Sequence, residues 1–198
     1  GLEDITSPGF YLNDTSTSTE LDSDVLYALC DANCFCRKGL TSYDVINSRG
    51  REIPRGCFHV SSFSAVYNAA DDNCQGLGGF VATVHDDAKE LFMLSLFPPK
   101  SKFWVGLRMN GTELVWADGS YDDFTLWAPG NPVTGQDCAY GQQQTGFVSS
   151  WFSAPCTDPL TNSMRYACQL RPCGTDCNSR GCGSRVQIWM ARPTAVLN

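Results

Sequence analysis

Residues 103–130 contain the stretches Phe103-Trp-Val-Gly-Leu107, Trp116-Ala-Asp-Gly119 and Trp127-Ala-Pro-Gly130. The first stretch is an apolar run of strand length, and Glu113-Leu-Val-Trp116 is its expected hairpin partner across a short turn. From residue 117 to 150 the chain is mostly Gly, Pro, Asp, Gln and Ser with little periodicity. A connector of that length inside a compact domain is typically functional or held in place by other contacts. This part of the chain therefore predicts a β-hairpin followed by a long loop.

The flanking sequence predicts two helices and three further strands. Strands are expected over residues 56–60, 80–84 and 164–170, and helices over 63–73 and 88–96. Ser61 or Ser62 is expected to cap the first helix. Asp87, with Glu90 three residues later, resembles an acidic capping pair for the second helix, which Pro98-Pro99 ends.

Composition excludes several classes of protein. Hydrophobic residues make up 42% of the 198 residues and charged residues 18%, which is enough apolar content for a packed core. The formal net charge of −7 argues against nucleic acid or an anionic membrane surface as a partner, because both require clustered Lys and Arg. There is no run of about 18 apolar residues, so we expect no membrane span.

Cysteine content indicates the compartment. The chain has 11 cysteines and two histidines, with no paired C-x-x-C motifs, so disulfides in an oxidising environment are expected rather than zinc sites. We therefore expect a secreted, extracellular protein. Neither His59 nor His85 stands in a recognised spacing with a nucleophile, so we do not expect an enzyme. Asn13 and Asn110 begin triplets with the form of N-glycosylation acceptors.

The order of motifs over residues 55–170 resembles the C-type lectin-like domain family. It runs W-V-G-L, W-x-D-G, W-x-x-G-x-P, D-C, W-x-x-x-x-C and Y-x-C after the two expected helices. The resemblance implies an α+β fold with two helices, small antiparallel sheets and a long loop region, stabilised by disulfides. It implies the pairs Cys74–Cys168 and Cys138–Cys156 and, as in members with an N-terminal hairpin, Cys36–Cys57. It also makes Trp104, Trp116 and Trp127 structural anchors.

We divide the chain into four parts. We expect residues 1–29 to form a flexible polar arm, 30–54 a Cys-rich hairpin extension, 55–170 the C-type lectin-like domain, and 171–198 a second Cys-rich extension. The cluster at residues 30–36 resembles segments that precede this domain in some secreted nematode lectins. Outside the three implied pairs remain Cys30, Cys34, Cys173, Cys177 and Cys182. Because five cysteines cannot all pair with one another, a disulfide-linked homodimer is a hypothesis.

Sugar-binding members of the family hold calcium with Glu-Pro-Asn, a later Glu and an Asn-Asp pair. The corresponding positions here are Asn131-Pro132-Val133, Gln136 and Phe152-Ser153, so every carboxylate is replaced. Calcium requires six to eight oxygen ligands with carboxylates among them. The resemblance therefore implies no metal site of the family type and no cofactor.

A second acidic group lies near the start of the loop. Asp118, Asp122 and Asp123 flank Tyr121. We expect a solvated turn there, with a secondary calcium site as the alternative.

These observations predict a recognition module that binds a protein or another extracellular ligand through residues 117–155 without calcium. The candidate ligand-binding residues are Asn131, Gln136, Phe147, Trp151 and Phe152. Aromatic side chains in a polar loop often mark interfaces, although these three can instead fill the core of the loop itself. The alternatives are a lectin that binds glycan through a non-standard site and a disulfide-linked structural or self-associating protein.

Overall fold

The structure is a computed structural model that describes residues 35–46, 50, 52–121, 123–144, 149–158 and 162–172. The elements of this part of the chain are β1 (Thr41–Ile46), β2 (Glu52–Val60), α2 (Tyr67–Gly76), β3 (Phe80–Val81), α3 (Asp87–Ser95), β4 (Lys102–Asn110), β5 (Glu113–Trp116), β6 (Cys138–Gln143), β7 (Ser149–Ala154) and β8 (Ala167–Leu170). Two helices and two antiparallel sheets confirm the α+β class. None of the described helices has the length and apolar character needed to cross a bilayer.

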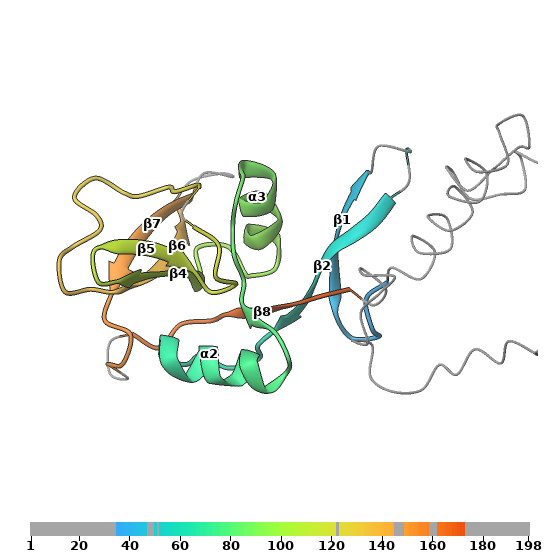
Figure 1. Cartoon of the computed structure of the whole chain (residues 1–198), viewed down its shortest axis with the longest axis horizontal. Helices are drawn as coiled ribbons and strands as arrows, with labels where there is room; N and C mark the ends of the chain where they lie inside the picture. The colour runs from blue at the N-terminus through green and yellow to red at the C-terminus, as the bar shows by residue number, and fades with distance from the viewer. Residues whose placement is uncertain are drawn as a thin grey trace, which may run out of the picture.

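The strands form two four-stranded sheets with the orders β1-β2-β8-β3 and β5-β4-β6-β7. In the first sheet the long strand β2 pairs with β8, which brings the start and the end of the domain together. Its β1–β2 hairpin projects away from the rest of the domain (Figure 1). The second sheet lies on the other side of β8, with α3 and α2 flanking it in this view. The expected hairpin of residues 103–107 and 113–116 is confirmed as β4 and β5.

The first helix begins four residues later than predicted. Ser61 does not cap it: the Ser61 hydroxyl donates to the carbonyl oxygen of Phe63 at 2.9 Å and accepts from the Phe63 N–H at 3.2 Å. These bonds stabilise a local turn, and α2 starts only at Tyr67, with Val66 as N-cap and no side-chain cap bond. Phe63 is consequently 54% exposed instead of facing the core.

The second helix is close to its prediction, but the cap lies one residue earlier. Asp86 is the N-cap of α3, and its carboxylate accepts a hydrogen bond from the Lys89 N–H at 2.7 Å. Asp87 and Glu90 follow in the first turn, where negative charge favours the helix dipole.

The predicted 34-residue loop is shorter than expected, because β6 and the first residues of β7 lie within residues 138–150. Strand propensity is low there, but tertiary packing selects the sheet. A Cβ on Gly141 would lie 2.6 Å from the Phe103 ring, so only glycine allows β6 to approach β4 at this point.

The three implied disulfides are confirmed: Cys36–Cys57, Cys74–Cys168 and Cys138–Cys156. The second joins α2 to β8 and the third joins β6 to the segment that follows β7. Closing long loops lowers the entropy of the unfolded chain, which stabilises the native state. The predictions for Asn13, Cys30, Cys34, Cys173, Cys177 and Cys182 concern residues outside the part of the chain that the structure describes.

Tryptophans dominate the core, as expected for structural anchors. Trp104, Trp116 and Trp151 are the largest fully buried side chains. The indole N–H of Trp104 donates to the carbonyl of Ala65 at 2.8 Å, which ties the segment before α2 to the second sheet. Trp127 is half-buried and packs edge-to-face against Trp151 at the base of the long loop.

Candidate ligand-binding loop

The long loop between β5 and β6 covers residues 117–137 and is fastened to β7 along part of its length. The Trp151 N–H donates to the carbonyl of Leu126 at 2.7 Å, and the Ala128 N–H donates to the carbonyl of Trp151 at 2.9 Å. Beyond this attachment the chain turns out at residues 129–135, most of which are exposed. In Figure 1 this stretch forms the outer edge of the molecule beyond the second sheet. The loop thus has a fixed base and an exposed tip.

Three neutral polar side chains meet at the base of that tip. The Ser153 hydroxyl lies 3.0 Å from Gln136 Oε1 and 3.2 Å from Asn131 Oδ1. Asn131 Oδ1 also accepts from the Ser153 N–H at 3.0 Å. The Val133 N–H completes the group by donating to Ser153 Oγ at 2.8 Å. We call Asn131, Gln136 and Ser153 the loop-tip cluster; it brings together two of the five candidate ligand residues.

The loop-tip cluster occupies the positions from which sugar-binding members of the resembled family hold calcium. Its oxygens are those of amides and a hydroxyl, and they are already engaged with one another or with a backbone N–H. Ser153 itself is only 7% exposed. Within the described residues there is no group of three or more His, Cys, Asp or Glu side chains suited to a metal ion. The hydrogen bonds of the cluster therefore hold residues 131–136 against β7.

The aromatic candidates separate onto two sides of β7. Trp151 has no exposed surface and meets Trp116, Phe124 and Trp127 edge-to-face, so it lies in the core of the loop and presents no side-chain surface to solvent. Phe152 points to the opposite face, as strand alternation requires, and is half-buried in a stack on Tyr140 at a centroid distance of 5.4 Å. Phe147 lies outside the described residues.

Asp118 and Asp123, at the start of the loop, form hydrogen bonds with other residues of the same chain. The Asp118 carboxylate accepts from the N–H and the hydroxyl of Ser120, at 2.9 and 2.6 Å. Asp123 Oδ1 lies 2.8 Å from His85 Nδ1 and accepts from the Trp116 indole N–H at 3.1 Å. Burial alone would raise the pKa of Asp123, but these contacts with His85 and Trp116 hold it below its ordinary value. Asp122 lies outside the described residues.

Comparison with known proteins identifies the family. Residues 64–169 match the family described as the Lectin C-type domain. The chain belongs to the C-type lectin domain family. Echinoidin of Heliocidaris crassispina is 25% identical over 122 residues, which cover 51% of this chain and 82% of echinoidin. The low affinity immunoglobulin epsilon Fc receptor of Homo sapiens is 30% identical over 90 residues, which are 42% of this chain and only 27% of the receptor.

Solved structures of other proteins share the fold. The domain of murine dendritic cell inhibitory receptor 2, in complex with N-glycan, superposes with a TM-score of 0.56 at 20% identity, covering 69% of this chain and 98% of that one. A calcium-independent type II antifreeze protein gives a TM-score of 0.56 at 20% identity, covering 70% and 96%. At these identities the likeness shows the fold alone. The matched family indicates no catalytic activity.

Two ionisable residues of this C-type lectin domain, Lys89 and Glu90, are buried although their sequence context does not predict it. Lys89, which is 6% exposed, places its Nζ atom 3.8 Å from the centroid of the Phe58 ring and 4.4 Å from that of Tyr43. Burial lowers the pKa of Lys89 to about 7, although the Asp86 carboxylate acts in the opposite direction. Its neighbour Glu90 accepts a hydrogen bond from the Ser149 hydroxyl, and burial raises its pKa. Adjacent residues of α3 thus contact the hairpin and β7.

Proposed function

We propose that this C-type lectin domain is an extracellular recognition module that binds its ligand through the tip of the long loop without calcium of the family type. The observation that carries the proposal is the loop-tip cluster, in which Ser153 joins Asn131 and Gln136 by hydrogen bonds. The disulfides of the described domain favour an oxidising, extracellular location.

The chemistry of the cluster opposes calcium. A calcium ion needs six to eight oxygens and carboxylates that offset its charge, whereas the cluster is neutral. The ion would also meet the Val133 N–H, which points into the cluster as a donor to Ser153. Entry of a calcium ion would break several of these hydrogen bonds, and the cluster offers no charged ligand in compensation. The same bonds order the loop before a ligand arrives, which lowers the entropic cost of binding.

The exposed tip favours a protein as the ligand. Val133, whose N–H donates to Ser153 of the cluster, is 45% exposed, and Tyr121 near the start of the loop is 80% exposed. Exposed apolar and aromatic side chains on an ordered loop are suited to protein interfaces. Among the relatives, the human receptor is named for binding an immunoglobulin, and another, from Patiria pectinifera, is named an α-N-acetylgalactosamine-specific lectin. A glycan bound through a non-standard site is therefore the second candidate.

Calorimetric titration with calcium tests the first half of the proposal. We expect no site tighter than about 1 mM, and no change in melting temperature when chelator is added. A matched positive control restores the family ligand set with the changes Asn131→Glu, Val133→Asn, Gln136→Glu, Phe152→Asn and Ser153→Asp. Calcium binding by the restored variant but not by the parent chain supports the proposal. Calcium stabilisation of the parent chain contradicts it, because a ligand that binds the native state raises its stability.

A binding screen tests the role of the tip. The folded chain is applied to arrays of extracellular proteins and of glycans, with and without chelator. Val133→Asp should abolish the signal while leaving the melting temperature unchanged. Leu77→Asp is the matched control, because Leu77 is also 45% exposed but follows α2. If the two variants affect binding equally, the ligand does not bind at the loop tip. A linked dimer remains a further hypothesis, which non-reducing gel electrophoresis tests.

A further inference from the structure

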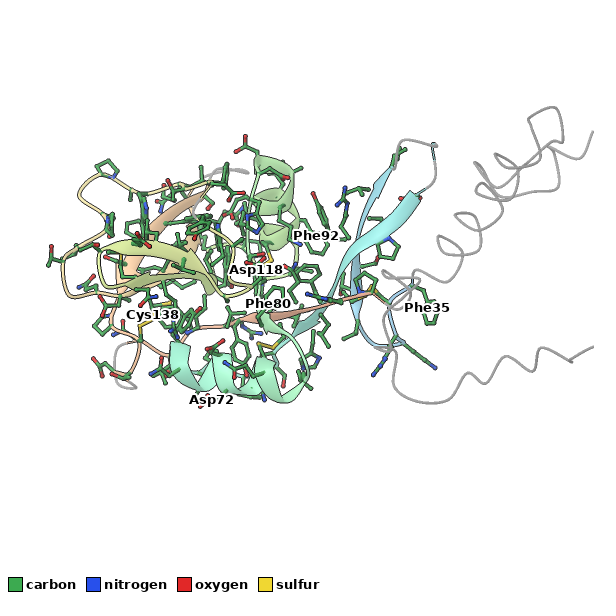
Figure 2. All side chains as sticks on the ribbon, viewed as in Figure 1. Phe35, Asp72, Phe80, Phe92, Asp118 and Cys138 are labelled. Atoms are coloured by element: carbon green, nitrogen blue, oxygen red, sulfur yellow. A yellow bond between two sulfur atoms is a disulfide. The ribbon has the colours of Figure 1, made fainter. Side chains whose placement is uncertain are left out.

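A cavity of about 900 Å³ lies between α2, β3, β8 and the β4–β5 hairpin. Figure 2 labels Phe80 and Asp118, which both line it and lie near the centre of the domain between α2 and the second sheet. None of the four candidate ligand-binding residues that the structure describes lines this cavity. It is thus separate from the loop-tip cluster, and an inference about it goes beyond the proposed function.

Three arginines from different segments converge on the cavity: Arg55 of β2, Arg108 of β4 and Arg171, which follows β8. All three are exposed. Arg108 is paired with Asp71, its Nη1 atom lying 3.7 Å from Asp71 Oδ2. Among the described residues, neither Arg55 nor Arg171 has a carboxylate partner. Two guanidinium groups at the rim are therefore available to an incoming anion.

The cavity wall adds an oriented amide. Gln169 Oε1 accepts from the N–H and the hydroxyl of Thr83, at 3.3 and 3.4 Å. This orientation leaves the Gln169 amide nitrogen as a donor on the wall of the cavity. The wall is closed by a tight contact between β8 and Gly79, where a Cβ would lie 2.3 Å from the Gln169 carbonyl oxygen. No other residue fits at position 79 without a shift of the backbone.

The charges in the cavity differ in sign from those of the whole chain. The chain has 14 Lys and Arg against 21 Asp and Glu, so its overall field repels anions. Of the two carboxylates that line the cavity among the described residues, Asp71 is paired with Arg108, and Asp118 accepts from Ser120 and lies 3.6 Å from His85 Nε2. A local excess of guanidinium remains. Guanidinium groups match carboxylate and sulfate oxygens through paired hydrogen bonds.

We propose that this cavity binds a small ligand through a carboxylate or sulfate group, with Arg55 and Arg171 as its principal contacts and Gln169 as a further donor. The volume of the cavity lies within the range of about 300–1,000 Å³ that is typical of small-molecule sites. It is larger than the volume that a bare inorganic anion occupies. A ligand of about two sugar rings fits that space, so acidic disaccharides are suitable probes.

Calorimetry on the whole folded chain tests the proposal at constant ionic strength. Three probes are compared: a sulfated disaccharide, an unsulfated disaccharide with a uronic carboxylate, and neutral lactose. Binding of at least one acidic probe, with no binding of lactose, supports the proposal, and the two acidic arms distinguish sulfate from carboxylate. Failure of both acidic probes to bind, or equal binding of lactose, overturns it. Because Asn110 also lines the cavity, all proteins carry Thr112→Ala, which removes the acceptor triplet.

Charge-removing variants then locate the site. Arg55→Gln and Arg171→Gln should each weaken binding of the acidic probe about tenfold, as expected for loss of a hydrogen bond to a charged group. The control is Arg165→Gln, which removes the same charge from a residue that does not line the cavity. If the control weakens binding equally, the effect is one of net charge and the proposal fails. Val133→Asp should leave this binding unchanged, so failure here and failure of the loop-tip proposal give different results.

Discussion

Two buried polar groups of this domain are stabilised in different ways. At the loop tip, Asn131 and Gln136 are joined through Ser153 by neutral hydrogen bonds. At the hairpin, the Lys89 ammonium is enclosed by the rings of Tyr43, Phe58 and Phe92, with its Nζ atom between 3.8 and 5.5 Å from the three ring centroids. Figure 2 labels Phe92 at the junction between α3 and the β1–β2 hairpin.

The difference predicts different responses to pH. The loop-tip cluster contains no ionisable side chain, so its hydrogen bonds are the same over the whole physiological range. The Lys89 ammonium, which packs against the hairpin, loses its hydration on burial. Cation–π contacts with the aromatic rings compensate only part of that free-energy cost, each being worth about 0.5–2 kcal/mol. The attachment of the hairpin should therefore depend on pH, whereas the order of the loop tip should not.

The largest expected effect comes from removing the support beneath the loop tip. Trp151→Ala deletes the fully buried indole against which Trp116, Phe124 and Trp127 pack. We expect the free energy of unfolding to fall by about 3–5 kcal/mol, measured by chemical denaturation. A loss below about 1 kcal/mol, which is typical of surface substitutions, would mean that the loop tip does not depend on this core.

The next effect tests the hairpin through pH. The unfolded state of Lys89 has its ordinary pKa of 10.5 and the folded state one of about 7. Below pH 7 both states are protonated and the full cost of burying the charge is present. Between about pH 7 and 10.5 the unfolded state binds more protons, so stability rises with pH. We expect a gain of about 2 kcal/mol across this window, which is less than the shift alone gives because cation–π contacts favour the charged form.

Lys89→Met isolates this contribution, because it keeps an unbranched side chain, one atom shorter, and removes the charge. Denaturation at several pH values should show that the rise in stability attributed to Lys89 disappears. Lys102→Met is the control: Lys102 is exposed, with its Nζ atom 5.1 Å from the Tyr140 ring, and the rise should persist. If the rise persists equally in both variants, Lys89 does not titrate in this window.

The fold could be predicted where local pattern and tertiary structure agree. The runs Phe103–Leu107 and Glu113–Trp116 have both the apolar content and the turn that a hairpin requires, and the motif order led to the three disulfides. Strand β6 and the first residues of β7 lie in a stretch whose composition predicts a loop, because Gly141 and the neighbouring Gln and Ser residues have low strand propensity. Their sheet depends on the close approach of Gly141 to Phe103, a contact that no local pattern contains.

The candidate site could be predicted only in part. The motif positions predicted Asn131 and Gln136 as site residues. For Ser153 they indicated only that a calcium ligand is replaced, whereas in the structure the Ser153 hydroxyl joins Asn131 to Gln136. Lys89 and Arg171 had no motif to identify them. A lysine near the start of a helix is usually solvated, and only the docking of the hairpin on α3 buries this one. Convergence of Arg55, Arg108 and Arg171 depends on strand pairing across the whole domain.

A smaller effect is expected for the centre of the loop-tip cluster. Ser153→Ala removes the hydroxyl that accepts from the Val133 N–H, and it leaves Gln136 Oε1 without that partner. We expect a loss of about 1–2 kcal/mol that is constant between pH 5 and 9. Hydrogen exchange should quicken at the Val133 amide but not at the hairpin. A loss that varies with pH would show that an ionisable group takes part in the cluster.

The smallest effect concerns the outer face of β7. Phe152→Ala removes a half-buried ring that stacks on Tyr140 at 5.4 Å, on the side of β7 opposite Trp151. Such a pair contributes about 0.5–1.5 kcal/mol beyond its buried area, so we expect a loss of about 1 kcal/mol, well below that of Trp151→Ala. The variant Phe152→Leu keeps most of the apolar surface and should lose less. If Phe152→Ala leaves stability unchanged but removes binding in the array screen, Phe152 belongs to the ligand surface. If it destabilises the domain as strongly as Trp151→Ala, the two faces of β7 form a single cooperative core.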